Sequence, residues 1–343
     1  MPLFSGMKRL AVLISGFVIC MYSCGVKKQI PDVSGIHIQL DTLRFEKDFF
    51  TMDTLNLESS LDRLQQKYPA FLNDYLYNLL GVPPNKDSTL YKVKQFIHDY
   101  KQVYDTVTAK YPSITGAANE IKKALQFVKY YFPNYKAPTA FITYTGPLEG
   151  YSNVLTSSGF AVGLQLYLGK NYPAYNTDYI ADIYPQYQSK RFDAPYITVD
   201  CIKNVISDLF PPKSDNQPLA YQMIEAGKRL YTLDAFMPET ADSLKTGYTQ
   251  LQLDGCYANE AAIWNVFVQN NLLYITDPGQ TRDYMSDAPK TETMGEASPG
   301  FIGQFVGWQI VKKWMGQDAK RTLPLLWQTP ARQIFEEARY KPR

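Results

Sequence analysis

The first two dozen residues differ in character from the rest of the chain and are typical of an export signal. The part of the chain that can fold follows them. Lys8 and Arg9 precede an apolar run, 11–21, that contains no charged residue. This run is shorter than the roughly 20 apolar residues that a membrane-spanning helix needs. A short basic segment followed by a short apolar segment is typical of a secretory signal peptide. We therefore expect residues 1–23 to form a signal peptide that is removed on export.

Cys24 is the expected attachment point of a lipid. Ser23 precedes it and the apolar Met21 lies three residues before it, which resembles the lipobox of bacterial lipoproteins. Met21 and Tyr22 differ from the usual residues of that motif, so an uncleaved N-terminal anchor or a plain signal peptide stays open as an alternative. Acyl chains on Cys24 would bury many methylene groups, at about 0.8 kcal/mol each, and hold the chain on a membrane.

The sequence after Cys24 favours the outer membrane over the inner one, with the protein facing the periplasm. Gly25 and Val26 stand where an aspartate would commonly retain a lipoprotein in the inner membrane, and no acidic run of the kind associated with surface export follows. The 35 Lys and Arg residues include Lys8 and Arg9, so the exported chain has as many basic residues as its 33 Asp and Glu residues. This neutrality argues against a nucleic-acid partner, because such partners are bound by neutralising phosphates.

One folded domain is expected after the anchor. Residues 24–35 comprise the lipidated cysteine and a polar tether, and residues 36–343 form a single α+β domain that is mostly helical, with a small β-sheet in the middle of the chain. Apolar residues make up 45% of the chain and charged residues 20%, which excludes intrinsic disorder. No long polar linker and no internal repeat divides this region.

Helices are expected where apolar side chains recur every three or four residues. These helices cover about 57–68, 71–80, 90–107, 121–131, 198–210, 218–236, 258–273, 300–316 and 330–340. Strands are expected where apolar and polar residues alternate or where β-branched and aromatic residues gather. These strands are 36–43, 139–145 and 159–169, and the stretch 146–158 is expected to be a turn.

Most catalytic chemistries lack their residues in this chain. His37 and His98 are the only histidines, which excludes a histidine-rich metal enzyme. Phosphate-binding glycine loops and the G-x-S-x-G turn of serine hydrolases are also missing from the sequence. We therefore predict no catalytic residue, no metal ligand and no cofactor, and interpret both histidines as structural.

The segment 200–211 is expected to be a two-sided helix. Its apolar side chains fall at a spacing that places them on one face, which is typical of a helix packed against a core. They are Ile202, Val205, Ile206 and Leu209, while Asp200, Lys203 and Ser207 lie on the other side, with Asn204 and Asp208 alongside. In a later helix, Gly300, Gly303 and Gly307 are spaced to admit a neighbouring helix.

Several segments have distinctive amino-acid sequences and occur in a distinctive order along the chain. They are RFEKDFF (44–50), LQQKYPAFLNDYL (64–76), YIADIYPQYQSKRF (179–192), NVISDLFP (204–211), GKRLY (227–231) and SPGFIGQFVGWQIVKKWM (298–315). Together they resemble the gliding-motility lipoprotein GldB family of Bacteroidetes over nearly the whole chain. The resemblance implies an envelope lipoprotein needed for gliding and bound up with the type 9 secretion machinery. The family offers no established catalytic residue to carry over.

A more distant resemblance is to zincin-type metallopeptidases. In those enzymes one helix bears H-E-x-x-H, whose histidines bind zinc, and a later helix adds a glutamate. Here the motif falls on 203–207, where Lys203 places a positive charge at the position of the ion, and the later ligand falls on Glu225 or Ala226. The resemblance implies a degenerate zincin-like scaffold in which Lys203 pairs with Glu225 or Glu260. The residues of this vestigial site are Lys203, Asn204, Ser207, Glu225 and Glu260; the alternative is a solvated helix face.

Cys201 and Cys256 remain in the exported chain after lipidation of Cys24. An oxidising compartment would allow them to form a disulfide. The alternative is a pair of buried thiols that behave as small apolar side chains.

Three functions follow from these observations. The first is a non-catalytic lipoprotein that binds other envelope proteins of the gliding and type 9 secretion machinery. The second is a peptidase or hydrolase, metal-dependent or not, with an unrecognised site. The third is an envelope module that binds peptides or glycans in a former substrate cleft.

Overall fold

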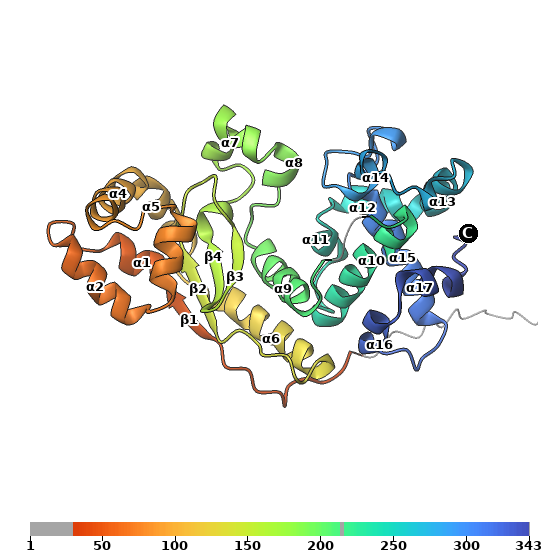
Figure 1. The fold of residues 1–343 in the computed structure, drawn as a ribbon, viewed down its shortest axis with the longest axis horizontal. Coiled ribbons are helices and arrows are strands. Elements are labelled where there is room, and N and C mark those ends of the chain that lie inside the picture. The colour runs from red at the N-terminus through yellow and green to blue at the C-terminus, as the bar shows by residue number, and fades with distance from the viewer. Residues whose placement is uncertain (1–29, 213–215, 343) are drawn as a thin grey trace, which may run out of the picture. The chain divides into compact units, whose positions relative to one another are not determined.

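The computed structural model describes residues 30–212 and 216–342 (Figure 1). It contains a four-stranded sheet with helices packed on both of its faces. The chain divides at Asp32, and Val33–Arg343 forms one compact unit. The fold is mostly helical α+β, as the sequence predicts. The expected signal peptide and Cys24 lie outside the described residues.

The sheet has the strand order β1-β2-β4-β3. Strands β1 and β4 run parallel to β2, whereas β3 pairs with β4 in antiparallel orientation and lies at the edge. The strands are β1 (Asp41–Arg44), β2 (Ala140–Tyr144), β3 (Asn153–Thr156) and β4 (Gly159–Gly163). A turn is expected from the sequence at 146–158, where β3 lies, and that expectation is wrong for Asn153–Thr156. The strand is short and half-buried, so it leaves little apolar signal between its flanking turn residues.

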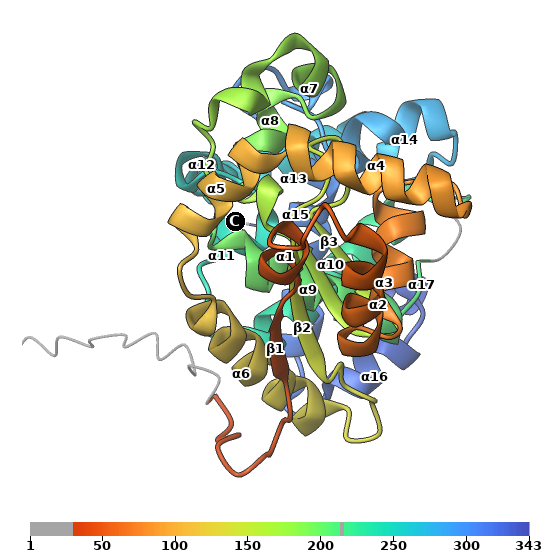
Figure 2. The same cartoon turned by 90° about the vertical axis from the view of Figure 1, so that its left-hand side faces the viewer.

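Helices before β2 in the chain pack on both faces of the sheet. They are α1 (Phe45–Phe50), α2 (Leu57–Lys67), α3 (Phe71–Asn73), the π-helical turn Asp74–Leu79, α4 (Lys86–Asp99), α5 (Lys101–Lys110) and α6 (Thr115–Tyr131). Of these, α1 to α5 pack on Ile142 and Ala161, whereas α6 packs on the opposite face with Phe141 and Phe160. Successive strand residues point to opposite faces, so the two layers have separate cores. Figure 2 shows α1, α2 and α4 in front of the sheet.

Most helices after β4 in the chain share a hydrophobic core with α6. The full set is α7 (Asp178–Ile183), α8 (Gln186–Ser189), α9 (Tyr196–Leu209), α10 (Leu219–Phe236), α11 (Asp242–Thr246), α12 (Gln250–Ala258), α13 (Glu260–Gln269), α14 (Pro278–Met285), α15 (Ile302–Gly316), α16 (Leu323–Gln328) and α17 (Ala331–Ala338). The expected helix at 90–107 is two helices that meet at Tyr100, and the one at 258–273 is mainly α13 preceded by α12. None of the helices within 30–212 and 216–342 combines the length and the apolar character needed to cross a bilayer.

Two long helices, α10 and α15, pack through glycines. A Cβ on Gly227 would overlap the backbone of Gly307, and a Cβ on Gly307 would overlap the carbonyl group of Met223. Gly300 and Gly303 likewise meet Ala288 and Tyr284 with no room for a side chain. The expectation that these glycines admit a neighbouring helix is confirmed for Gly303 and Gly307. It is wrong for Gly300, which lies before α15 and meets Ala288 in a loop.

Candidate functional site

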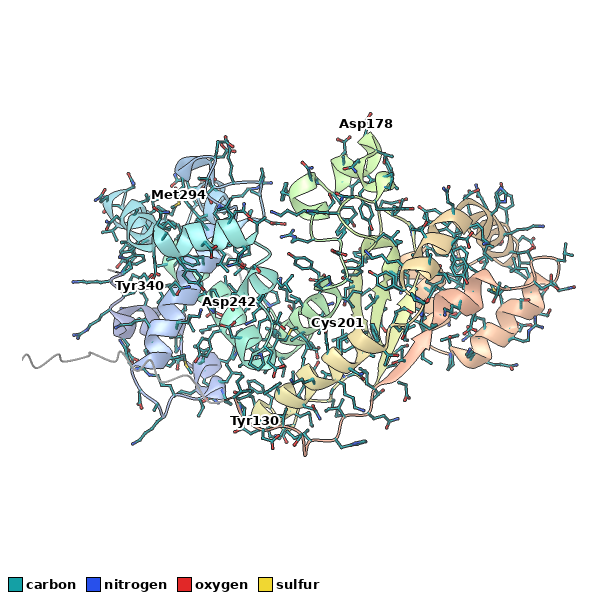
Figure 3. The ribbon with its side chains drawn as sticks, turned by 180° about the vertical axis from the view of Figure 1, so that it is seen from behind. Tyr130, Asp178, Cys201, Asp242, Met294 and Tyr340 are labelled. Carbon is teal, nitrogen blue, oxygen red and sulfur yellow. The ribbon has the colours of Figure 1, made fainter. Side chains whose placement is uncertain are left out.

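A cleft of ≈ 470 Å³ is lined by residues of α8 and α9 and by residues of α11 and α12. Figure 1 shows where these four helices lie in the fold. Figure 3 labels Cys201 on α9 and Asp242 on α11, the helices that flank the cleft. Its lining includes Ser152 and Asn153 at the start of the edge strand. It is the candidate site because the polar side of α9 opens into it.

The sequence of α9 explains why polar groups reach the cleft. Apolar side chains of this helix, including Ile202 and Val205, are fully buried in the core. The helical repeat then turns Asp200, Lys203 and Asn204 toward the other side, where they line the cleft. This arrangement agrees with the two-sided helix predicted from the sequence.

Hydrogen bonds join α9 to the edge strand β3. The Asn204 side chain donates from Nδ2 to Oδ1 of Asn153 at 2.8 Å and to its carbonyl oxygen at 3.3 Å. The Asn153 amide donates in turn to Sγ of Cys201 at 3.0 Å. Asn204 is therefore a link between the helix and the strand.

Both cysteines of the folded unit are free and buried. Of the two alternatives that the sequence left open, the structure therefore has the pair of buried thiols and not the disulfide between Cys201 and Cys256. Burial raises the pKa of the Cys201 thiol far above its ordinary value and raises the pKa of Cys256 to about 12. Because the thiolate is the reactive form, both act as packing residues.

Asp200 and Lys203 both line the cleft, and the charge of each acts on the pKa of the other. The Tyr167 hydroxyl donates to Oδ2 of Asp200 at 2.8 Å. Burial raises the pKa of the Asp200 carboxyl, and the charge of Lys203 and the Tyr167 hydroxyl oppose that rise. Burial lowers the pKa of Lys203, and the charge of Asp200 opposes that fall. The two groups thus share a poorly hydrated environment.

Arg191 and Asp287 form an ion pair at the rim of the cleft. Nη1 and Nη2 of Arg191 both donate to the carboxylate of Asp287, the first at 3.2 Å. Gly247, at φ +75°, lies against the Arg191 guanidinium, where a Cβ would be 3.0 Å from Nη1. This pair is not predictable from the sequence, because no periodicity joins two loop residues so far apart in the chain.

The predicted vestigial site is not brought together. Lys203 and Asn204 line the cleft, but Ser207 is exposed and lies within 3.5 Å of Arg229. Glu225 accepts from Nζ of Lys228 at 2.9 Å, and Glu260 accepts from the Tyr340 hydroxyl. The charges that act on Lys203 are those of Asp200, Arg191 and Asp287. The expected pairing of Lys203 with Glu225 or Glu260 is therefore wrong, because those glutamates face other elements.

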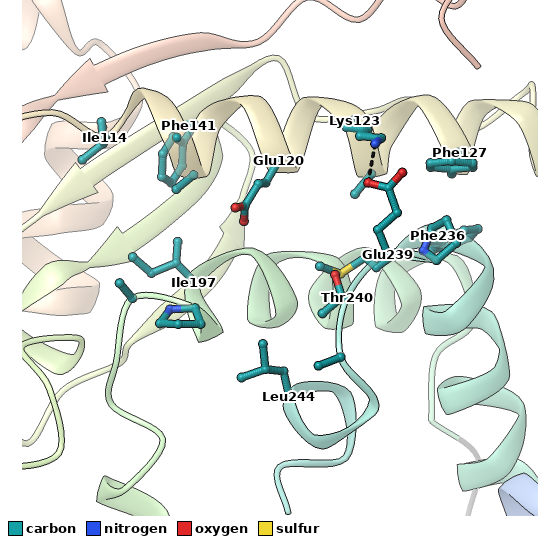
Figure 4. A pocket seen from close by; sticks show the side chains of 18 of the residues that line it. Ile114, Glu120, Lys123, Phe127, Phe141, Ile197, Phe236, Glu239, Thr240 and Leu244 are labelled. Atoms are coloured by element: carbon teal, nitrogen blue, oxygen red, sulfur yellow. Dashed lines mark hydrogen bonds and ion pairs between the residues drawn. The ribbon is translucent and has the colours of Figure 1, made fainter. Parts of the chain in front are cut away.

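A second cavity, of ≈ 640 Å³, lies between α6 and the segment that joins α10 to α11 (Figure 4). Phe127, Phe236 and other apolar side chains line it, and an ion pair of 2.6 Å joins Lys123 to Glu239 across it. Glu120 also lies along it and accepts from the Thr198 hydroxyl at 2.9 Å. Its acidic and basic groups are thus already partnered.

Metal ligands do not cluster in the described part of the chain. Within residues 30–212 and 216–342, no group of three or more His, Cys, Asp or Glu side chains is arranged to hold an ion. His37 and His98 are both exposed, and neither lines the cleft. The cleft instead offers ammonium, guanidinium, carboxylate and amide groups, which suit the binding of a polar ligand.

Comparison with known proteins gives one match. The family model described as gliding motility protein GldB matches residues 26–342. No curated protein and no solved structure matches the chain. The similarity to zincin-type metallopeptidases therefore stays a prediction.

Proposed function

Because the chain belongs to the gliding motility protein GldB family, we propose that it is a lipid-anchored envelope protein that supports gliding, type 9 protein secretion or both. It faces the periplasm, on the outer membrane rather than the inner one, and works by binding other envelope proteins without catalysis. The match over residues 26–342 carries this proposal, because it covers the whole folded unit together with most of the tether.

The cleft supports a binding role. The resemblance to zincins sets Lys203, Ser207 and Asn204 at the positions of two zinc ligands and a base, and of these Lys203 and Asn204 line the cleft. An ammonium group repels a cation, and an amide does not accept a proton from water at neutral pH. Lys203 is instead suited to ion pairing with a partner.

An in-frame deletion in the source organism tests the proposal. We expect colonies that no longer spread on agar and culture fluid that contains less type 9 cargo. The wild-type gene should restore both, and so should C20A, because Cys20 leaves with the signal peptide. C24A should restore neither. A deletion strain that spreads and secretes normally would overturn the proposal.

Metal analysis separates this proposal from the peptidase alternative. The purified full-length chain in detergent should contain no stoichiometric zinc. Zinc at one equivalent, lost in K203A or E225A, would favour a metal-dependent hydrolase instead.

A further inference from the structure

Among residues 30–212 and 216–342, no strand lies on the outer side of the edge strand β3. On its inner side β3 pairs with β4, in a register that sets Asn153 opposite Val162 and Thr156 opposite Gly159. The backbone N–H of Gly163 donates to the carbonyl of Ser152 at 2.8 Å, so Ser152 points its backbone groups toward β4. Backbone groups alternate in direction along an antiparallel strand. Those of Asn153 and Leu155 therefore point away from β4. The Asn153 carbonyl accepts from Nδ2 of Asn204, so the N–H of Asn153 and both backbone groups of Leu155 face the free edge.

Hollows follow β3 along its length. Ser152 and Asn153 line the cleft described above. A second hollow, of ≈ 690 Å³, is lined by residues 154–159, by the segment 135–139 that precedes β2, and by Asn204, Ser207 and Asp208 of α9. Asn204 lines both. Consecutive residues of β3 therefore border open space, with the outer side of α9 beside them; we call this surface the β3 groove.

The cleft end of the β3 groove carries two ammonium groups that no carboxylate of the described residues contacts directly. Within residues 30–212 and 216–342, neither Lys190 nor Lys203 forms a hydrogen bond or an ion pair within 4.0 Å, although both line the cleft. The carboxylate of Asp287 is engaged by Arg191, and that of Asp200 accepts from Tyr167. An anionic group entering the cleft would therefore find two ammonium groups available to it.

We propose that the β3 groove binds an extended peptide segment of a partner protein by strand addition, with an acidic side chain of that segment between Lys190 and Lys203. The N–H of Asn153 and the N–H and carbonyl of Leu155 pair with the backbone of the segment, and the lysines select its charge. The exposed ring of Tyr151, just before β3, offers an apolar contact beside it. This inference rests on the proposed function and specifies the chemistry of the partner.

Peptide selection tests the inference. The probe is a library of random peptides of about ten residues, long enough to cover β3 at about 3.4 Å per residue, offered to the full-length chain in detergent. We expect the enriched peptides to contain Asp or Glu. Replacing that residue by Asn or Gln should weaken binding by about tenfold or more, since a charge-assisted contact is lost.

Variants of the protein test the role of the lysine. K203Q should lose about tenfold in affinity for the enriched peptide, and K203R should retain it. K94Q is the matched control, because Lys94 is an exposed lysine on α4 that lies outside the groove, and its affinity should be unchanged. A thermal unfolding curve of K203Q that matches that of the wild type shows that the loss is not a folding defect.

N-methylation of the peptide tests strand addition itself. Because every second residue of an added strand points its N–H toward β3, methylating residues of one parity should abolish binding and methylating the other parity should not. Equal tolerance at all positions would overturn the inference, and so would the absence of enriched acidic peptides or the binding of cell-wall glycan fragments in their place. If any of these three results were obtained with a deletion strain that fails to spread, the inference would be wrong and the proposed role in motility would still hold.

Discussion

Gly227 of α10 and Gly307 of α15 bring the backbones of the two helices into direct contact. A Cβ on either glycine would overlap backbone atoms of the other helix. This contact positions the start of α15, where Gln304 donates to the carbonyl of Thr246 at 3.0 Å. The Tyr248 hydroxyl also donates to the carbonyl of Phe301 at 3.0 Å. One wall of the cleft thus depends on two residues that have no side chain.

G307A should destabilise the fold. The new methyl group would overlap the Met223 carbonyl, and backbone cannot move aside as a flexible side chain can. We expect a loss of about 3 kcal/mol or more in the free energy of unfolding, measured by denaturant titration. G255A is the control, because a Cβ on Gly255 of α12 would have no neighbouring atom within 4 Å. There the better helix propensity of alanine should stabilise by up to about 1 kcal/mol, and equal effects of the two substitutions would contradict the packing argument.

C24A should move the protein from the detergent phase to the aqueous phase in phase partitioning. Without the thiol, no diacylglycerol can be attached, and no helix in the described part of the chain is suited to span a bilayer. C20A should stay in the detergent phase. Detergent-phase recovery of C24A would instead favour the uncleaved N-terminal anchor.

K228M should destabilise the packing between α10 and the C-terminal helices. Lys228 is fully buried, and its Nζ donates to Glu225 at 2.9 Å and to the carbonyl of Thr329 at 2.8 Å. Removing one partner of a buried ion pair leaves the other poorly solvated, so we expect a loss of about 3 kcal/mol. K313M, at an exposed lysine of α15, should change stability by less than about 0.5 kcal/mol in the same titration. A K228M chain as stable as K313M would show that the buried ammonium group is dispensable.

D200N should change how stability depends on pH. Burial raises the pKa of Asp200 above 3.8, so the folded state keeps this proton to a higher pH than the unfolded chain does. Asp200 therefore contributes stability that is complete below pH 3.8 and is lost as the pH rises through the folded-state pKa. Asparagine can still accept from Tyr167 but does not titrate.

The stability of D200N relative to the wild type should therefore rise with pH across that window, as measured by denaturant titrations at several pH values. A relative stability of D200N that is flat or falls with pH would contradict a raised pKa.

The spacing of apolar residues along the chain was enough to predict α9 and α10, because the side chains that face the core recur with the period of the helix itself. The strand expected at 36–43 was placed too early, since β1 is Asp41–Arg44 and begins where its partner β2 begins. Residues 36–40 show the same alternation but have no neighbouring strand. Pairing between distant segments therefore decided which part of the alternating stretch became a strand.

The sequence by itself determined the buried face of α9 and the packing role of Gly303 and Gly307, because both depend on spacing within one helix. Only the tertiary structure decided which charges surround Lys203. Asp200 lies one turn before it, but Arg191 and Asp287 reach the cleft from separate loops. Their approach depends on how α10 packs against α15, and no local pattern in the chain encodes a contact between segments that only the fold brings together.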